Sequence, residues 1–312
     1  MRSESIIVGE HTKYPLKGML TLPADESRDG KLPAVVLVHG SGSSNMDEKV
    51  LKLTPFKDLA LGLAEHGIAS VRYDKRTFVY GRKMMKEKEP ITVKEETIED
   101  AILAAELLRA DKRIDPERIF IIGHSMGGML APRIDAEGGN FRGLILLAGT
   151  PRKLEEILVD QTEEMLDGMN PIMKLLYGNV LQKLCKKLEG MYEISDEETK
   201  KKKLMNGTTL YYFKETGEHA AENYLREMTK PLLVMQGEKD FQVKLDKDFA
   251  LYQEILKDYP DVTYKVYEGL NHCFVPTIYG DIKKAMKEYN VEQHIEADVI
   301  GDIAEWIWRV CS

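Results

Sequence analysis

A serine flanked by glycines two positions away on each side stands where an apolar run gives way to a helical pattern. It is Ser125, in Gly123-His124-Ser125-Met126-Gly127, directly after the apolar stretch 119–122. A tight strand-to-helix turn of this kind exposes a serine hydroxyl, and the N-terminus of the following helix favours developing negative charge. We therefore predict that Ser125 is a nucleophile in acyl transfer. The same motif also occurs as a plain glycine-rich turn, so the prediction depends on the residues that could assist Ser125.

A serine hydroxyl needs a base to accept its proton. Of the seven histidines in the chain, His272 lies in the segment 268–274, immediately after the last predicted strand. A loop at that position overhangs the sheet edge at which Ser125 is expected. His294 lies at the edge of the final predicted helix, away from that edge. We therefore predict His272 as the base.

The base in turn needs an acid that holds its tautomer and orientation. Asp240 follows another apolar run, 232–236, and a glycine turn, so it should lie at the same sheet edge. Glu238 and Asp246 are the competing carboxylates, and a helix cap or a turn is the alternative role for Asp240. The resulting chain order is nucleophile, acid, base, with Asp240 before His272.

Acyl transfer also needs donors for the oxyanion that forms on the substrate carbonyl. The turn at Ser125 nominates the backbone N–H of Met126. The second donor is expected from the glycine-rich segment 39–44, which follows an early apolar run. There the N–H of Ser41 is our first choice, and that of Gly42 is the alternative.

These residues must be positioned by a regular framework, and the sequence predicts one. Continuous apolar runs rich in β-branched residues are typical of strands buried on both faces, and apolar residues at helical spacing separate them. Repeated strand–helix units predict an α/β fold with a mostly parallel sheet covered on both faces. The expected strands are 5–9, 18–22, 34–38, 68–73, 118–122, 143–148, 232–236 and 262–266, and the expected helices are 55–66, 93–110, 125–135, 246–257 and 295–310.

The strand–helix alternation stops between residues 151 and 230. This stretch is rich in Leu, Met and Tyr and carries charged helical segments. We expect residues 1–150 and 231–312 to form the catalytic core, and 151–230 to form a helical lid inserted between two strands. Extra helical packing without a part in substrate binding is the alternative.

Composition limits the classes of partner. The net charge of −8 argues against nucleic acid, which calls for a basic face. No apolar run is long enough for a membrane span or a signal-peptide core, so we expect no membrane association. The widely spaced Cys185, Cys273 and Cys311 suit neither a disulfide framework nor a metal site, which predicts a cytoplasmic protein. Self-association into a homo-oligomer is left open.

Two charged pairs could be mistaken for functional sites. Asp47 and Glu48 have no histidine nearby in the sequence, so we expect them to face solvent rather than bind a metal. Lys75 and Arg76 follow a predicted strand at the active edge and could bind an acidic group of a substrate. A salt bridge with Asp74 or another carboxylate is the expectation we prefer.

The chain resembles the α/β-hydrolase superfamily, and within it bacterial esterases grouped with dienelactone hydrolases and prolyl-oligopeptidase-like enzymes. The resemblance covers roughly residues 30–150 and 230–312. Thr77-Phe78 departs from the glycine turn usual in such esterases, which leaves the segment through Pro90 undefined. The matching segments are His39-Gly40-Ser41-Gly42, Tyr73-Asp74-Lys75-Arg76, Gly123-His124-Ser125-Met126-Gly127-Gly128, Gln236-Gly237-Glu238-Lys239-Asp240 and Asn271-His272.

The resemblance implies carboxylic-ester hydrolysis without a cofactor or a metal. We expect a serine carboxylesterase that acts on small-to-medium acyl or aryl esters, hydroxycinnamoyl esters among them, through a Ser-His-Asp triad and an acyl-enzyme. The lid should shape an apolar pocket for this small-molecule substrate. A serine peptidase or amidase and an acyltransferase are the alternatives within the same chemistry. A ligand receptor built on a hydrolase fold is the alternative outside it, and an incomplete triad would favour it.

Overall fold

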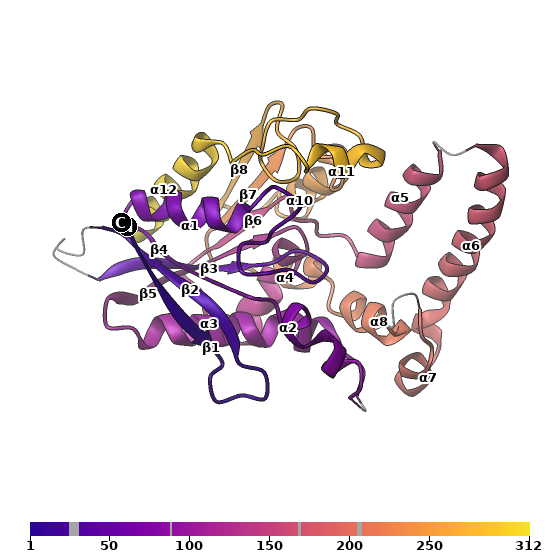
Figure 1. Cartoon of the computed structure of the whole chain (residues 1–312), viewed down its shortest axis with the longest axis horizontal. Helices are drawn as coiled ribbons and strands as arrows, with labels where there is room; N and C mark the ends of the chain where they lie inside the picture. The colour runs from indigo at the N-terminus through magenta and orange to yellow at the C-terminus, as the bar shows by residue number, and fades with distance from the viewer. Residues whose placement is uncertain (25–30, 88, 168–169, 205–207) are drawn as a thin grey trace.

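A single eight-stranded sheet lies at the centre of the computed structural model, which describes residues 1–24, 31–87, 89–167, 170–204 and 208–312 (Figure 1). The strand order is β1-β2-β4-β3-β5-β6-β7-β8. The strands are β1 (Arg2–Val8), β2 (Leu16–Leu22), β3 (Leu32–Val38), β4 (Ala69–Tyr73), β5 (Ile114–His124), β6 (Leu144–Leu147), β7 (Leu232–Gly237) and β8 (Val262–Tyr267).

The sheet is mostly parallel, as predicted. β1 pairs antiparallel with β2 and β2 with β4, whereas all pairings from β4 to β8 are parallel. Parallel strands end at a common edge, so the segments that follow β3, β5 and β7 meet there. β5 begins at Ile114, four residues before the predicted start at 118.

Strand β3 illustrates why a continuous apolar run becomes a central strand. Its side chains alternate between the two faces of the sheet, and all of them are buried. Val35 and Leu37 join the core that α1 (Pro55–Glu65) and α12 (Ala297–Cys311) cover. Val36 and its neighbours on the other face join the core that α3 (Glu99–Ala110), α4 (Met126–Ile134) and α10 (Ala250–Ile255) cover. Figure 1 shows α1 and α12 together on one side of the sheet and α3 on the other.

Several helices differ from the sequence expectation. The segment after β4 that the sequence left undefined contains α2 (Arg76–Met84). The helix predicted over 93–110 begins with a π-helical turn, η1 (Lys94–Ile98), before α3. The helix predicted over 246–257 likewise combines η5 (Leu245–Phe249) with α10. The remaining short elements are η2 (Asp135–Gly139), η6 (Ile282–Lys284) and α11 (Ala285–Glu288).

The chain between β6 and β7 forms helices that project to one side of the sheet (Figure 1). We call this segment, residues 151–230, the insertion. Its last helix joins the main core, because Ala221 and Leu225 are buried there near α4. The described helices of the insertion are α5 (Leu154–Asp167), α6 (Pro171–Glu189), η3 (Gly190–Glu193), α7 (Asp196–Lys201), α8 (Leu210–Glu218) and α9 (Ala221–Arg226).

Candidate active site

Ser125 occupies the sharp turn between β5 and α4. Its backbone has φ 54° and ψ −118°, a conformation that costs a non-glycine residue about 1–3 kcal/mol. Glycines make the turn feasible: a Cβ on Gly123 would lie 2.2 Å from the carbonyl oxygen of Gly127, and one on Gly127 would lie 2.1 Å from that of Val38. The partly exposed Ser125 lines a large cleft. Strain of this kind is often found at functional sites.

Asp240 and His272 lie in contact after β7 and β8. The His272 Nδ1 is 2.7 Å from the Asp240 Oδ2, and both side chains are buried. The Asp240 Oδ1 accepts hydrogen bonds from the backbone N–H groups of Gln242 and Val243, at 2.8 and 3.0 Å. A third donor, the Gln236 side-chain amide, lies 2.8 Å from Oδ2. The carboxylate is therefore held in place to orient the His272 ring.

Gly237 allows the loop that carries His272 to approach the end of β7. A Cβ at this position would lie 2.5 Å from the carbonyl oxygens of Leu270 and Asn271. No hydrogen bond joins the Ser125 hydroxyl to His272 among the described residues. In unliganded hydrolases such bonds are often long and shorten only when substrate binds.

The competing residues lie elsewhere. Glu238 accepts from the Gly269 N–H on the outer side of the turn. His294 is exposed and contacts Asp58 on α1. His219 contacts Tyr224 within the insertion.

A buried ion pair lies behind the nucleophile, and it corrects one sequence expectation. Glu48 was expected to face solvent, but it is only 5% exposed. Its Oε2 lies 2.9 Å from the Nδ1 of His124, without the alignment of a hydrogen bond, and its Oε1 accepts the Gly40 N–H at 2.7 Å. Asp47, its neighbour, is partly exposed and binds Arg72. Glu48 was misassigned because the sequence places no histidine near it, whereas the fold brings His124 beside it from the end of β5.

Ionisation of this pair follows from its surroundings. Burial disfavours the charge on His124, but the contact with Glu48, the His272 carbonyl and the charge of Asp240 together outweigh it and raise the His124 pKa above its usual value of 6.5. Burial likewise disfavours the charge on Glu48, but His124 lowers the Glu48 pKa below its usual 4.5. Burial lowers the pKa of His39 to about 4, although the charge of Glu48 opposes this shift.

The candidate oxyanion donors lie close to the nucleophile. The N–H of Met126 belongs to the first turn of α4, where a helix supplies no acceptor. In the β3 loop, a Cβ on Gly40 would lie 3.1 Å from the Ser125 Cβ, so the next peptide passes beside the serine. The Ser41 N–H that follows has no hydrogen-bond acceptor among the described residues. Gly42, the alternative donor, has φ 81° and is exposed.

Lys75 and Arg76 both form ion pairs, which is the expectation that we preferred over contact with a substrate. Lys75 Nζ lies 2.8 Å from the Glu96 Oε1, and Arg76 pairs with Asp100 and Glu99. The predicted partner Asp74 instead accepts from the Met46 N–H at 2.8 Å. Cys273 is buried in a small apolar cluster, and burial raises the pKa of its thiol, so it acts as packing.

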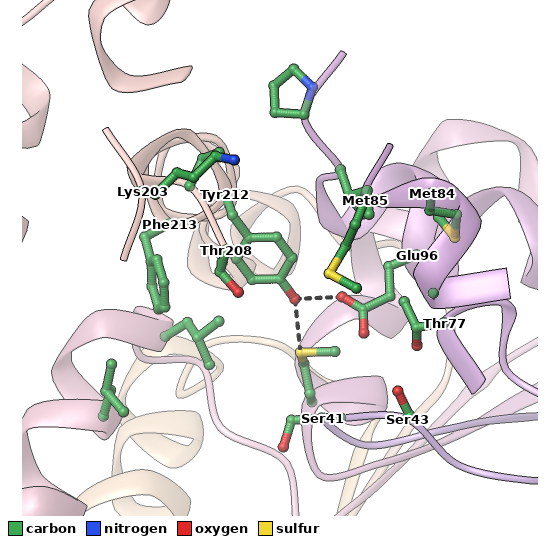
Figure 2. Close-up of a pocket in the computed structure, with 18 of the residues that line it drawn as sticks. Ser41, Ser43, Thr77, Met84, Met85, Glu96, Lys203, Thr208, Tyr212 and Phe213 are labelled. Atoms are coloured by element: carbon green, nitrogen blue, oxygen red, sulfur yellow. Dashed lines mark hydrogen bonds between the residues drawn. The ribbon is translucent and has the colours of Figure 1, made fainter. Parts of the chain in front are cut away.

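The cleft above Ser125 has a volume of about 1280 Å³ and is lined by both the core and the insertion. Figure 2 shows Met84, Met85 and Thr77 on one side and Tyr212, Phe213 and Thr208 on the other, with Ser41 and Ser43 below. Methionine and aromatic side chains give the cleft apolar surface. Charged side chains line it as well, among them Arg82 and Glu87 of the core and Lys200 and Lys203 of the insertion.

The fold and this site define the class of the protein. A mostly parallel sheet that presents a serine at a strand–helix turn, with an aspartate and a histidine after later strands, is the α/β-hydrolase fold. A family model described as serine aminopeptidase, S33, matches residues 32–276, and the chain belongs to this family.

Relatives of known identity agree with this assignment. The chain is 35% identical over 306 residues to esterase EstD of Thermotoga maritima, covering 97% of this chain and 68% of EstD. Est1E from Butyrivibrio proteoclasticus superposes with a TM-score of 0.58 at 16% identity, covering 98% of both chains. An esterase of Pyrococcus furiosus gives a TM-score of 0.57 at 14% identity, covering 100% of this chain and 92% of the other. At these identities the two solved structures show a shared fold.

The helices of the structure also bear on whether the chain could cross a membrane. Within the described ranges, no helix combines the length and apolar character that crossing a bilayer requires.

Proposed function

We propose that this protein is a serine carboxylesterase in which Ser125 is the nucleophile, His272 the base and Asp240 the acid that orients it. The observation that carries the proposal is the Asp240–His272 contact of 2.7 Å at the sheet edge where the strained Ser125 turn opens into the cleft. The 35% identity to an esterase over nearly the whole chain supports the ester class of substrate.

The reaction would proceed in two acyl-transfer steps. Ser125 Oγ attacks the ester carbonyl while His272 takes its proton, and the Met126 and Ser41 N–H groups stabilise the oxyanion. His272 then protonates the departing alcohol, which leaves an acyl-Ser125. In the second step His272 accepts a proton from water, the resulting hydroxide attacks the acyl carbon, and Ser125 regains its proton as the acid departs.

We propose the insertion as a lid that shapes the acyl or aryl pocket. Ile157 and Leu158 of α5 and Phe213 of α8 line the cleft together with Met84 and Met129 of the core. A volume of about 1280 Å³ exceeds what a small ester fills, so medium-length acyl or aryl groups should react faster than acetate. Hydroxycinnamoyl esters belong in the test because ferulic acid has been seen bound to Est1E.

Amide hydrolysis and acyl transfer to alcohols use the same residues and stay alternatives. The family description includes aminopeptidases, which makes aminoacyl amides the relevant comparison. Cytoplasmic location and self-association stay predictions from the sequence.

The decisive experiment measures kcat/KM for a panel of p-nitrophenyl esters of increasing chain length, hydroxycinnamoyl esters and aminoacyl amides. Esters of medium length should be hydrolysed best, and Ser125→Ala should lose both this activity and labelling by a fluorophosphonate probe. Equal labelling of the wild type and Ser125→Ala would show that Ser125 is not the nucleophile. Faster cleavage of aminoacyl amides than of all esters would show that the protein is a peptidase rather than an esterase.

A further inference from the structure

The peptide between Gly40 and Ser41 is fixed by a buried lysine. Lys75 Nζ donates a hydrogen bond to the Gly40 carbonyl oxygen at 2.8 Å. The Lys75 side chain is only 2% exposed, so it faces the protein interior rather than a substrate. On the other side of Gly40, Glu48 Oε1 accepts the Gly40 N–H at 2.7 Å. Both peptide groups that flank Gly40 are therefore held by ionisable side chains.

The direction of this bond bears on the oxyanion hole. The Gly40 carbonyl and the Ser41 N–H belong to the same planar, trans peptide, so they point in opposite directions. Lys75 pulls the carbonyl into the interior, which turns the Ser41 N–H toward the cleft. A cation on a peptide carbonyl also polarises the peptide and strengthens its N–H as a donor.

We propose that Lys75 is a positioning residue of the oxyanion hole, which aims the Ser41 N–H at the oxyanion through the Gly40 carbonyl. This inference rests on the proposed esterase function. It assigns a role to a buried charge that the two acyl-transfer steps do not otherwise use. Because Lys75 holds a donor rather than supplying one, it should act on the transition state more than on substrate binding.

A second contact of Glu96, the carboxylate that pairs with Lys75, extends this hydrogen-bond network to the insertion. Glu96 in η1 pairs with Lys75 through Oε1 at 2.8 Å and accepts from the Tyr212 hydroxyl through Oε2 at 2.7 Å. The same hydroxyl lies 3.8 Å from the sulfur of Met126, the residue of the other candidate oxyanion donor (Figure 2). Burial and the charge of Glu96 raise the Tyr212 pKa well above 10, so the hydroxyl remains a donor. Helix α8 of the insertion thus contacts Met126 directly and is linked to the Gly40–Ser41 peptide through Glu96 and Lys75.

The test compares wild type with Lys75→Met, which keeps the length of the side chain but removes its donors. We expect kcat to fall about 10- to 100-fold, less than the roughly 10²- to 10³-fold loss on removing an oxyanion donor, with KM within threefold. An acyl trifluoromethyl ketone, which forms an oxyanion with Ser125, should bind more weakly by the same factor as kcat/KM falls. The corresponding methyl ketone, which binds without that charge, should keep its affinity.

Two variants separate this role from a structural one. Lys75→Met leaves Glu96 as a buried carboxylate without its cation, so Lys75→Met combined with Glu96→Gln provides a neutral site and should show the same pattern. The matched control is Lys214→Met. Lys214 is also buried and likewise donates to a backbone carbonyl, that of Ile194 at 2.9 Å, and to a carboxylate, Asp196 at 2.8 Å. This variant should keep kcat within about twofold.

The link to the insertion is tested by Tyr212→Phe, which should lower kcat severalfold with the same contrast between the two ketones. Unchanged kcat in both Lys75 variants, or equal weakening of both ketones, would overturn the positioning role. A wild-type protein that hydrolyses no ester would instead overturn the proposed function, and this inference with it.

Discussion

The Nε2 of His124 lies 3.0 Å from the backbone carbonyl oxygen of His272, and the two rings have centroids 4.8 Å apart. A carbonyl oxygen can only accept, so Nε2 of His124 carries a proton. His124 immediately precedes Ser125, which means that this bond ties the candidate nucleophile turn to the loop of the candidate base. Through Nδ1 the same ring contacts Glu48, and Glu48 holds Gly40. One buried imidazole thus connects three segments of the active edge.

The Glu48–His124 pair should make stability depend on pH. The raised pKa of His124 contributes stability below its usual 6.5 and loses it as pH rises through the raised value. The lowered pKa of Glu48 contributes stability above its usual 4.5 and loses it as pH falls through the lowered value. Glu48→Gln should therefore lower the free energy of unfolding by about 1–3 kcal/mol near pH 5.5, and by less at pH 9. Urea unfolding at the two pH values measures this.

The control for that measurement is Glu197→Gln, at a side chain 74% exposed on α7. It should change the free energy of unfolding by less than about 0.5 kcal/mol at either pH. A Glu48→Gln effect of the same size at pH 5.5 and pH 9 would contradict an ionised pair.

Asp240→Asn tests the orienting acid. The amide nitrogen or oxygen can occupy the place of Oδ2, but it cannot favour the His272 tautomer and its developing charge as a carboxylate does. We expect kcat to fall by about 10³- to 10⁴-fold with little change in KM. Steady-state kinetics measure the loss, and Glu238→Gln, which removes the competing carboxylate, should leave kcat within about threefold. A larger loss of kcat in Glu238→Gln than in Asp240→Asn would instead identify Glu238 as the orienting acid.

Much of the framework could be predicted because burial leaves a direct mark on sequence. The run 34–38 is apolar at every position, since β3 packs against helices on both faces, and it appears as a strand at the expected place. The turn at Ser125 was predictable from its glycines, because only glycine fits where backbone atoms approach to about 2 Å of a Cβ position. The π-helical turn η1 was not predictable, because its residues also fit an ordinary helix, and helix α2 lies in the segment that the sequence left undefined.

The candidate site was predictable where residues follow strands, and less so where they meet across the fold. Asp240 and His272 come directly after β7 and β8, and parallel strands deliver both to one edge. Glu48 reaches the same edge from a loop and Glu96 from the helix start at η1. Each pairs with a buried cationic side chain elsewhere in the chain, Glu48 with His124 and Glu96 with Lys75. Tyr212 lies in the insertion, far from Glu96 in the chain, so their contact leaves no signal in a single sequence.

The strain at Ser125 can be measured as stability. At φ 54° and ψ −118° alanine is strained as serine is, whereas glycine adopts this conformation freely. Ser125→Gly should therefore be about 1 kcal/mol more stable to urea than Ser125→Ala, with both variants inactive. The same pair of substitutions at Ser3, in the extended strand β1, should favour alanine instead. A more stable alanine at position 125 would show that the turn is not strained.

A larger side chain at Ile157 should change which esters react. Ile157 lies on α5 and lines the cleft, so Ile157→Trp fills part of the space proposed for the acyl chain. We expect kcat/KM for p-nitrophenyl octanoate to fall at least about tenfold, because losing the pocket contacts of one or two methylene groups has an effect of this size. The kcat/KM for p-nitrophenyl acetate should stay within about threefold. The chain-length optimum should therefore move to shorter esters.

The control for this variant is Val180→Trp, on α6 at a side chain 55% exposed and outside the cleft lining. It should leave the chain-length profile unchanged. Fluorescence-monitored unfolding separates pocket filling from damage to the fold, because Ile157→Trp should unfold within about 1.5 kcal/mol of wild type. A loss of the same factor for acetate and octanoate, in a variant as stable as wild type, would contradict a specificity role for the insertion. The insertion would then be packing around a core that selects its substrates alone.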